Sequence, residues 1–347
     1  MDGASQPPPP KTCAIDVNDG AKTLHVPPGK TLFEVLNDAD IHLPTICGGR
    51  GKCGRCRLTV LSGADEPTDA EKKHLSADQL KAGLRLGCQV KVNRDLAIRV
   101  PEEVLQARPF RAKLESVRDL THDIKRFRFE LTEPQRIEFI PGRYIKLHLP
   151  KAVDPSGASR AFSIASPPSE ARRVELIVRL HPDGTCTNWM FNDLQAGQEV
   201  RFDGPYGQFG LTDGDAEMIW IAGGSGMSAF WSILRHLAEM KNFSRPTTLY
   251  FGAVARRDLY LQEELRGYEK QLNWFTYVPA LSQPAEGDAW EGQLGLVTDV
   301  AARRLENVAN VEAYLCGPPG MIDAGLAMLH AKGLGQERIF FDKFEHR

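Results

Sequence analysis

The sequence predicts a multidomain protein in which a small mixed α/β domain, an antiparallel β-barrel and a doubly wound parallel sheet follow one another. Its 347 residues exceed what one hydrophobic core usually supports. The hydrophobic pattern also changes twice along the chain. Short strands around a helical stretch fill 11–105, period-2 strands with a turn about every ten residues fill 106–212, and apolar strand-like runs alternating with helical stretches fill 213–347. These patterns are typical of a mixed sheet crossed by a helix, a closed barrel, and a parallel sheet with helices on both faces.

Composition and charge exclude several classes of protein. Residues 1–10 are proline-rich and polar, and we expect them to form a disordered tail. The chain as a whole has 42% hydrophobic and 25% charged residues, as ordinary globular proteins do. A formal net charge of −2 gives no reason to expect a nucleic acid or an anionic membrane as partner. No apolar run reaches the roughly 18 residues of a membrane span and no secretory signal peptide is evident, so we expect a cytoplasmic protein without an integral membrane segment.

The first domain contains the stretch CGGRGKCGRC at 47–56. Cys47, Cys53 and Cys56 are separated by five and then two residues, and Cys88 follows after 31 more. A zinc ribbon would need a second CxxC pair, and seven cysteines without a signal peptide disfavour a disulfide set. Three clustered cysteines and a distant fourth are instead typical of a [2Fe–2S] cluster, although the plant-type first gap is one residue shorter. Reduced thiols in a mobile glycine loop, or a zinc ion, are the alternatives.

The glycines of this loop have a physical reason, because backbone N–H groups aimed at cluster sulfurs need positive φ angles and no Cβ in the way. Cys56 leads directly into the predicted strand RLTV, and Cys88 is predicted to open the strand QVKV. The loop is also crowded with the cations Arg50, Lys52, Arg55 and Arg57. These either stabilise an anionic cluster locally or present a basic rim to an acidic partner protein.

The middle domain carries RAFS inside a predicted strand. Arg160 is suited to grip a phosphate with its planar guanidinium, Phe162 offers an aromatic face, and Ser163 offers a hydroxyl. Further on, GTCTNW places Thr187 near the start of a predicted helix, where unpaired N–H groups accept phosphates. The plain alternatives are a surface arginine with a core phenylalanine, and an ordinary capped helix.

In the third domain the strand MIWIA enters the glycine turn GGSGMS, which lets the backbone approach a pyrophosphate. The turn lacks the GxGxxG spacing, so a standard Rossmann fingerprint is excluded. A later strand ends in CGPPGM, and Cys316 would face the crevice at the carboxyl ends of the strands. A buried, inert cysteine is the competing interpretation.

Taken together, the chain resembles the ferredoxin–NAD(P)H reductase superfamily in its form with a fused [2Fe–2S] domain. The motifs appear in family order: PGRYI at 141–145, RAFS at 160–163, GPYGQF at 204–209, GGSGMS at 223–228, CGPPGM at 316–321 and FDKF at 341–344. The reductase half is most similar to the reductase component of phenol hydroxylase. The ferredoxin half is similar to the F subunit of the sodium-pumping NADH:quinone reductase, which shares the cysteine gaps of five, two and 31. That relative has an N-terminal membrane helix, for which this sequence shows no counterpart.

The resemblance implies a β-grasp ferredoxin domain over 11–105, an FAD-binding barrel over 106–212 and an NAD-binding domain over 213–347. It also implies the site residues. The cluster ligands would be Cys47, Cys53, Cys56 and Cys88; the FAD-binding residues Tyr144, Arg160, Phe162, Ser163 and Thr187; the NADH-binding residues Gly223, Gly224, Gly226, Met227, Gly317 and Pro318; and the catalytic residues Cys316, beside the nicotinamide, and Phe344, covering the flavin ring.

The function implied is an NADH:acceptor oxidoreductase that passes electrons from NADH through FAD and the [2Fe–2S] cluster to a partner redox protein, the oxygenase component of a multicomponent system. A quinone or a cobalamin protein is the alternative acceptor. A redox sensor would need an output module, for which the sequence leaves no room. Gln283 in YVPALSQP predicts NADH over NADPH because it cannot pair with a 2′-phosphate, whereas Arg256 and Arg257 argue the other way.

Overall fold

The structure is a computed structural model of the chain. The structure describes residues 12–39, 41, 43, 49–52, 54–101, 104–105, 107–287 and 289–344. The chain divides into two compact units, Met1–Arg108 and Pro109–Arg347, and each is described by itself. Within the described residues, no helix is long and apolar enough to cross a membrane.

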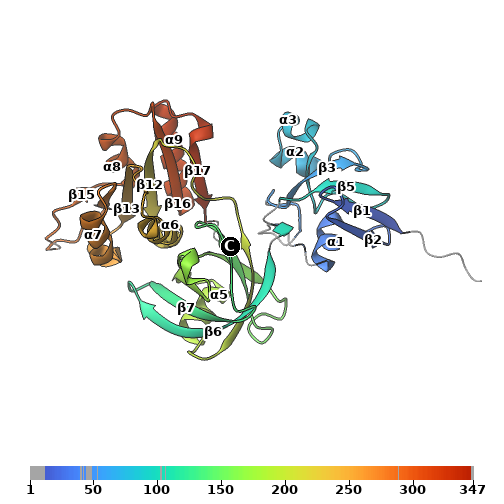
Figure 1. Ribbon diagram of the computed structural model, residues 1–347, viewed down its shortest axis with the longest axis horizontal. Coiled ribbons are helices and arrows are strands. Elements are labelled where there is room, and N and C mark those ends of the chain that lie inside the picture. Colours follow the sequence, from blue (N-terminus) through green and yellow to red (C-terminus); the bar gives the residue numbers. More distant parts are fainter. Residues whose placement is uncertain are drawn as a thin grey trace, which may run out of the picture. The chain divides into compact units, whose positions relative to one another are not determined.

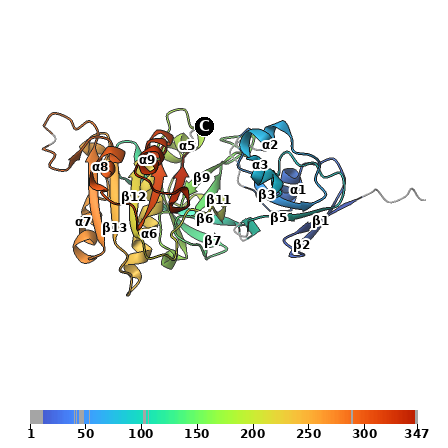
Figure 2. The same ribbon diagram turned by 90° about the horizontal axis from the view of Figure 1, so that it is seen from above.

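The first unit is built on a mixed sheet crossed by a helix (Figure 2). Its described strands are ordered β2-β1-β5-β3-β4, with β1 and β5 parallel. Helix α1 buries its apolar side in the same core, and a capping box between Thr31 and Glu34 fixes its start. The elements are β1 (Cys13–Val17), β2 (Lys22–Val26), α1 (Leu32–Asp38), β3 (Arg57–Ser62), α2 (Asp69–His74), α3 (Ala77–Lys81), β4 (Leu84–Leu86) and β5 (Leu96–Arg99). The predicted β-grasp arrangement is confirmed.

The prediction that Cys88 opens a strand QVKV is wrong. The strand is β4, which ends two residues before Cys88, and Cys88 lies in the turn that follows. The apolar alternation of QVKV has another cause. Val90 and Val92 are buried, and their carbonyls accept the N–H groups of Leu32 and Gly29 at 2.8 and 2.9 Å, so the segment packs against the start of α1 instead of extending the sheet.

The second unit begins with an antiparallel barrel whose described strands are ordered β10-β7-β6-β11-β8-β9. The strands are β6 (Arg108–Asp119), β7 (Ile124–Glu133), β8 (Tyr144–His148), β9 (Ser159–Ser163), β10 (Arg173–Arg179) and β11 (Glu199–Tyr206). A bridge between Ile164 and Leu176 joins the two edge strands and closes the barrel, as predicted. The 3₁₀ turn η1 (Pro168–Glu170) and helix α5 (Thr185–Asn192) lie in its connections.

A parallel sheet, ordered β15-β14-β13-β12-β16-β17, forms the rest of this unit. Figure 1 shows α6 and α7 on one face and α8 and α9 on the other. The alternating side chains of β12 explain this, because Trp220 and Ala222 pack with α6 and α7 while Ile219 and Ile221 pack with α8 and α9. The elements are β12 (Glu217–Gly223), η2 (Gly224–Gly226), α6 (Met227–Glu239), β13 (Thr247–Ala253), η3 (Arg256–Asp258), α7 (Gln262–Gln271), β14 (Phe275–Leu281), β15 (Gln293–Leu294), α8 (Val297–Arg304), β16 (Val311–Gly317), α9 (Pro319–Ala331), η4 (Gln336–Arg338) and β17 (Ile339–Lys343). The predicted doubly wound sheet is confirmed.

Candidate redox site

Two of the four predicted cluster ligands lie together in the first unit. Cys56 immediately precedes β3, and Cys88 lies in the turn after β4, the strand that pairs with β3. Gly87 donates its N–H to the carbonyl of Cys56 at 2.7 Å, and the Cys56 thiol donates a hydrogen bond to the Cys88 sulfur. Both side chains are buried. Cys47 and Cys53 lie outside the described residues, so the set of four ligands stays a prediction.

The surroundings of Cys88 favour a thiolate. The hydrogen bond from Cys56 is the main cause that lowers the pKa of Cys88 to about 6; burial opposes it. The side chain of Gln89 and the backbone N–H groups of Gly51 and Cys88 add further hydrogen bonds to the sulfur. The N–H donors from Gln89, Gly51 and Cys88 would also serve a cluster-bound sulfur, whereas a cluster-bound Cys56 would have no S–H to donate. Iron–sulfur clusters are held by thiolates with N–H donors around them, so these residues fit a [2Fe–2S] cluster.

The glycine loop meets the conformational demand predicted for it. Gly49, Gly51 and Gly54 have φ angles of +83°, +70° and +62°. A Cβ on Gly51 would lie 2.7 Å from the amide nitrogen of Gln89, and one on Gly54 would lie 2.9 Å from the side chain of His74. Backbone conformation therefore disfavours side chains at all three positions, and at Gly54 the side chain of His74 also takes up the space.

The RAFS segment forms β9, as predicted. Arg160 is exposed, Phe162 is half-buried against the barrel core, and Ser163 is buried. Burial raises the pKa of Cys186, in the first turn of α5, to about 12, and the charge of Arg160 partly offsets this rise. Arg160 therefore lies within electrostatic reach of the N-terminus of α5. A guanidinium and the unpaired first-turn N–H groups of a helix together suit a pyrophosphate, so the residues fit FAD.

The hydroxyl of Thr187 forms hydrogen bonds within the loop before α5. Its hydroxyl accepts the N–H of His181 at 3.0 Å and donates to the carbonyls of His181 and Gly184 at 3.2 Å each. These bonds shape the loop that leads into α5. The predicted contact of Thr187 with the FAD pyrophosphate stays a prediction.

Tyr144 lies directly beside the RAFS strand, because it pairs with Ser163 across β8 and β9. Its ring centroid is 5.7 Å from that of Tyr206 in the GPYGQF motif. Tyr206 is fully buried, and its hydroxyl has no hydrogen-bond partner among the described residues. A buried polar atom without a partner marks a place where a polar group of a bound cofactor would fit. The sequence motif contained Tyr206, but nothing in the sequence indicated this orphaned hydroxyl.

The glycine turn after β12 packs tightly against the end of β16. A Cβ on Gly226 would lie 2.1 Å from the carbonyl oxygen of Cys316, and one on Gly317 would lie 2.8 Å from that of Gly223. These glycines thus allow two backbones to approach each other, a reason the sequence did not suggest. Met227 is fully buried in the core, and Pro318 is the N-cap of α9. Their predicted contacts with NADH stay predictions.

A basic side chain that sequence reasoning missed abuts the same turn. A Cβ on Gly224, whose φ is +54°, would lie 2.8 Å from a guanidinium nitrogen of Arg179 on β10. Arg179 is also paired with Asp123 at 2.8 Å, and the Tyr260 hydroxyl donates to the carbonyl of Gly224 at 2.8 Å. The barrel thus places a cation against the predicted dinucleotide turn, a juxtaposition that only the fold creates.

Three polar side chains from separate strands converge where the barrel meets the parallel sheet. Ser163 of β9 donates a hydrogen bond to Asp342 of β17 at 3.5 Å, and Asp342 pairs in register with Cys316 of β16. Cys316 is fully buried; burial, aided by the charge of Asp342, raises its pKa well above the ordinary value, so its thiol is neutral. Sequence reasoning missed Asp342, although the FDKF motif contains it.

Phe344, predicted to cover the flavin, follows β17 directly. Its N–H donates to the carbonyl of Gly317 at 3.0 Å, and its half-buried side chain packs against the core beneath α6. Phe344 is therefore anchored to the same segment as Cys316. Its role over the flavin ring stays a prediction.

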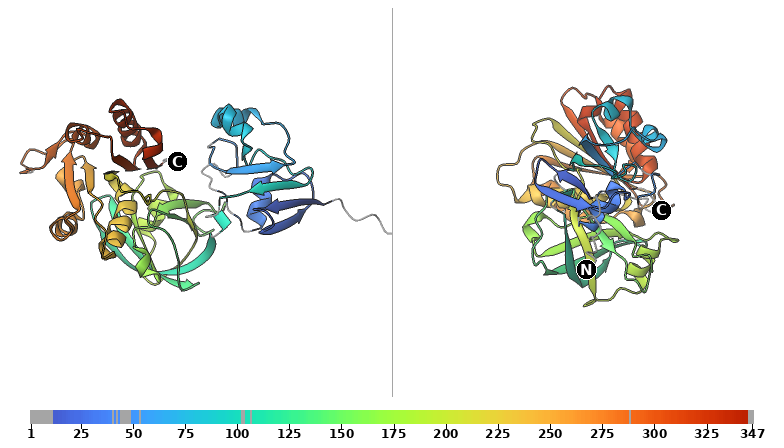
Figure 3. Two further views of the ribbon diagram at one scale, coloured as in Figure 1. Left: turned by 45° about the horizontal axis from the view of Figure 1, so that its top comes forward. Right: turned by 90° about the vertical axis from the view of Figure 1, so that its right-hand side faces the viewer.

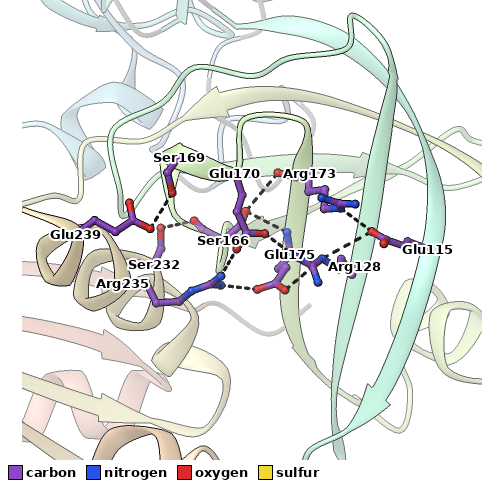
Figure 4. Close-up of polar contacts among 10 residues, drawn as sticks. All are labelled: Glu115, Arg128, Ser166, Ser169, Glu170, Arg173, Glu175, Ser232, Arg235 and Glu239. Atoms are coloured by element: carbon purple, nitrogen blue, oxygen red, sulfur yellow. Dashed lines mark hydrogen bonds and ion pairs between the residues drawn. The ribbon is translucent and has the colours of Figure 1, made fainter. Parts of the chain in front are cut away.

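An ion-pair network fixes helix α6 to the barrel. In Figure 3 the gold helix lies against the green strands, and Figure 4 shows the side chains between them. Arg235 on α6 contacts Glu175 of β10 at 2.7 Å and also pairs with Glu170. Arg128 of β7 contacts the same two carboxylates at 3.6 and 2.7 Å. Because α6 starts at the glycine turn, this network holds that turn in place relative to the barrel.

Comparison with known proteins identifies these modules. Family models match the 2Fe-2S iron-sulfur cluster binding domain at residues 12–93, the oxidoreductase FAD-binding domain at 111–210 and the oxidoreductase NAD-binding domain at 220–325. The chain is 32% identical to the xylene/toluene monooxygenase electron transfer component of Pseudomonas putida, over 100% of this chain and 97% of that protein. The chain belongs to the ferredoxin–NAD(P)H reductase family with a fused [2Fe–2S] domain.

Other relatives are similar to the reductase over most of their length. It is 33% identical to the reductase component of propane 2-monooxygenase from Mycolicibacterium goodii, over 88% of this chain and 89% of that one. It is 31% identical to the F subunit of the Na(+)-translocating NADH-quinone reductase of Neisseria meningitidis, over 95% and 91%. Among solved structures, the Amycolatopsis cytochrome P450 reductase matches with a TM-score of 0.77 and 31% identity, over 96% of this chain and 99% of that chain. The reductase is thus an oxidoreductase with [2Fe–2S], FAD and NAD domains. The domain boundaries at 105/106 and 212/213 stay predictions.

Proposed function

We propose that this reductase oxidises NADH where the barrel meets the parallel sheet and delivers electrons through Cys56 and Cys88 to the oxygenase component of a multicomponent system. The convergence of Ser163, Cys316 and Asp342 carries the first half of the proposal, because it brings the predicted FAD and NADH residues to one place. Bound FAD would supply the exchange between a two-electron hydride donor and a one-electron cluster.

The chain's own residues would bind and orient the reactants. Arg160 and the start of α5 would hold the FAD pyrophosphate, and Arg179 would neutralise charge at the glycine turn. The neutral thiol of Cys316 adds a polarisable contact without a charge, so it excludes water and does not attract ions. Asp342, through its hydrogen bond from Ser163, fixes the hydroxyl of that serine. None of these residues has to give or take a proton during hydride transfer, so positioning is their main task.

The names of the relatives support an oxygenase component as the acceptor, since the xylene/toluene and propane 2-monooxygenase proteins serve such systems. A quinone is the second candidate, because the matching component of the Na(+)-translocating NADH-quinone reductase is similar over nearly the whole chain.

Stopped-flow absorbance tests the proposal. Mixing the holoenzyme with NADH should bleach the flavin band before the cluster bands. The NADH-reduced enzyme is then mixed separately with the oxygenase component of the xylene/toluene system and with ubiquinone-1. Faster reoxidation by the oxygenase component supports the proposal. Faster reoxidation by ubiquinone-1 supports the second candidate, and a cluster that stays oxidised would refute the electron path itself.

A further inference from the structure

The side-chain amide of Gln89 lies against the sulfur of Cys88. Its nitrogen Nε2 is 3.5 Å from Cys88 Sγ and 3.2 Å from the Cys88 carbonyl oxygen. The amide oxygen, on the other side, accepts the hydroxyl of Thr68 at 3.3 Å. A metal-bound thiolate only accepts hydrogen bonds, so the N–H side of the amide must face the sulfur. The contact with Thr68 agrees with this orientation.

A buried ion pair holds the partner of Gln89 in place. Thr68 caps α2 in a capping box with Glu71, whose carboxylate is fully buried. Arg85 on β4 binds both oxygens of Glu71, at 2.8 and 2.9 Å, and the Leu86 N–H donates to one of them at 3.0 Å. The same carboxylate thus ties α2 to the strand that ends just before Cys88. A rigid scaffold of this kind fixes the direction of a hydrogen bond from outside the metal ligands.

Gly51 of the glycine loop lies directly against the amide of Gln89. A Cβ on Gly51 would lie only 2.7 Å from Gln89 Nε2. The absence of a side chain at Gly51 therefore makes room for the amide of Gln89. Gln89 is half-buried beside Cys88, and nothing in the cysteine spacing indicates this contact.

We propose that Gln89 donates a hydrogen bond to the cluster through Cys88 and thereby raises the reduction potential of the [2Fe–2S] centre. Hydrogen bonds to ligand sulfurs favour the oxidation state with more negative charge, which is the reduced state. Gln89 is a positioning and tuning residue, because it acts through a ligand and does not touch iron. The inference rests on the proposed ligand role of Cys88.

The test replaces Gln89 by Leu, which keeps the bulk and removes the N–H donor. Asn93→Ala is the control, because Asn93 is an exposed amide in the same segment and makes no described contact with Cys88. In a redox titration of the holoenzyme followed by EPR, the ratio of reduced to oxidised cluster in Q89L at a fixed solution potential should fall about tenfold, a shift of about −59 mV for one electron. The cluster of Asn93→Ala should have the wild-type reduction potential. The reduction potential of the flavin should be unchanged in both variants.

A Q89L cluster of normal iron content with the wild-type potential would overturn the proposal. If Q89L fails to hold its cluster, the hydrogen bond from Gln89 is tested in the wild-type enzyme instead. Glutamine labelled with 15N in its side chain should show a hyperfine coupling to the reduced cluster, and its absence would equally refute the role of Gln89. A failure of the ligand assignment would look different. If Cys88 were not a ligand, the Cys88→Ser variant would keep a normal cluster.

Discussion

Replacing Arg235 by Gln tests whether the network in Figure 4 holds the barrel and the parallel sheet together. The side chain of Glu175 is 4% exposed and that of Arg235 is 18% exposed, so this ion pair is largely shielded from water. Arg235→Gln leaves a buried carboxylate with a weaker partner. Removing one member of a buried pair typically costs about 3–5 kcal/mol, because the other charge stays buried.

The remaining contacts reduce that cost in this enzyme. Arg128 stays within 3.6 Å of Glu175 and 2.7 Å of Glu170, so neither carboxylate loses all its compensation. We therefore expect a loss of ~2–3 kcal/mol. For a unit the size of Pro109–Arg347 this lowers the melting temperature by roughly 4–12 °C. Because α6 begins at the glycine turn, KM for NADH should rise as well.

The assay follows flavin fluorescence on heating, which increases when the unfolding barrel releases FAD. Arg173→Gln is the matched control, because Arg173 contacts Glu115 at the exposed end of the same network, where its side chain is 41% exposed. Exposed pairs contribute little to stability, so the control should melt like the wild type. Equal melting of Arg235→Gln and Arg173→Gln would show that the shielded pair does not hold the two sheets together.

Four further predictions follow from the site. Cys88→Ser should remove or distort the [2Fe–2S] EPR signal and stop electron delivery while flavin reduction by NADH continues; a normal signal would refute the ligand assignment. NADH should exceed NADPH by at least about tenfold in kcat/KM, because Gln283 cannot pair with a 2′-phosphate; equal efficiency would point to Arg256 and Arg257. Changing Arg50 and Lys52 together to Gln should slow transfer to the acceptor and flatten its dependence on salt; a shifted cluster potential with an unchanged salt dependence would assign them to the cluster instead. Burial raises the pKa of Cys186 from 9.0 to about 12, so between these pH values the thiol stays protonated in the folded state and ionises in the unfolded state. The contribution of Cys186 to the free energy of unfolding should therefore be fully present below pH 9 and fall by about 1.4 kcal/mol per pH unit toward pH 12. Denaturant midpoints of wild type and Cys186→Ser at pH 8 and 10.5 check this last point, and equal pH dependence in both would contradict it.

The fold was accessible to sequence reasoning because each domain has its own hydrophobic period. The strand MIWIA and the glycine turn after it were predicted at their observed places, since burial on both faces requires an unbroken apolar run. The same reasoning failed at QVKV. Its alternation satisfies the pattern of a strand, but the buried valines pack under α1. A period of two reports which side chains are buried, and the backbone partners depend on tertiary contacts.

The candidate site was predictable only where a motif contains all of its members. RAFS and the cysteine spacing can be recognised in the sequence itself, so Arg160, Cys56 and Cys88 could be singled out as candidates, and their roles stay predictions. Arg179 and Gln89 were missed because their significance lies in contacts with Gly224 and Cys88 that the fold creates. Glycine was the most ambiguous signal. Gly226 suits the approach of a dinucleotide as well as its observed packing against the backbone of Cys316, and sequence alone does not separate the two.

The two cysteines Cys88 and Cys316 show what the fold adds to identical side chains. Both are buried, and burial alone raises the pKa of a thiol. At Cys88 this effect is outweighed by hydrogen bonds from Cys56, from Gln89 and from backbone N–H groups, so the pKa falls. At Cys316 the charge of Asp342 acts in the same direction as burial, so the pKa rises. One sulfur thereby favours the anionic form and the other the neutral form, and what separates them is the set of S–H and N–H donors that the fold directs at each sulfur.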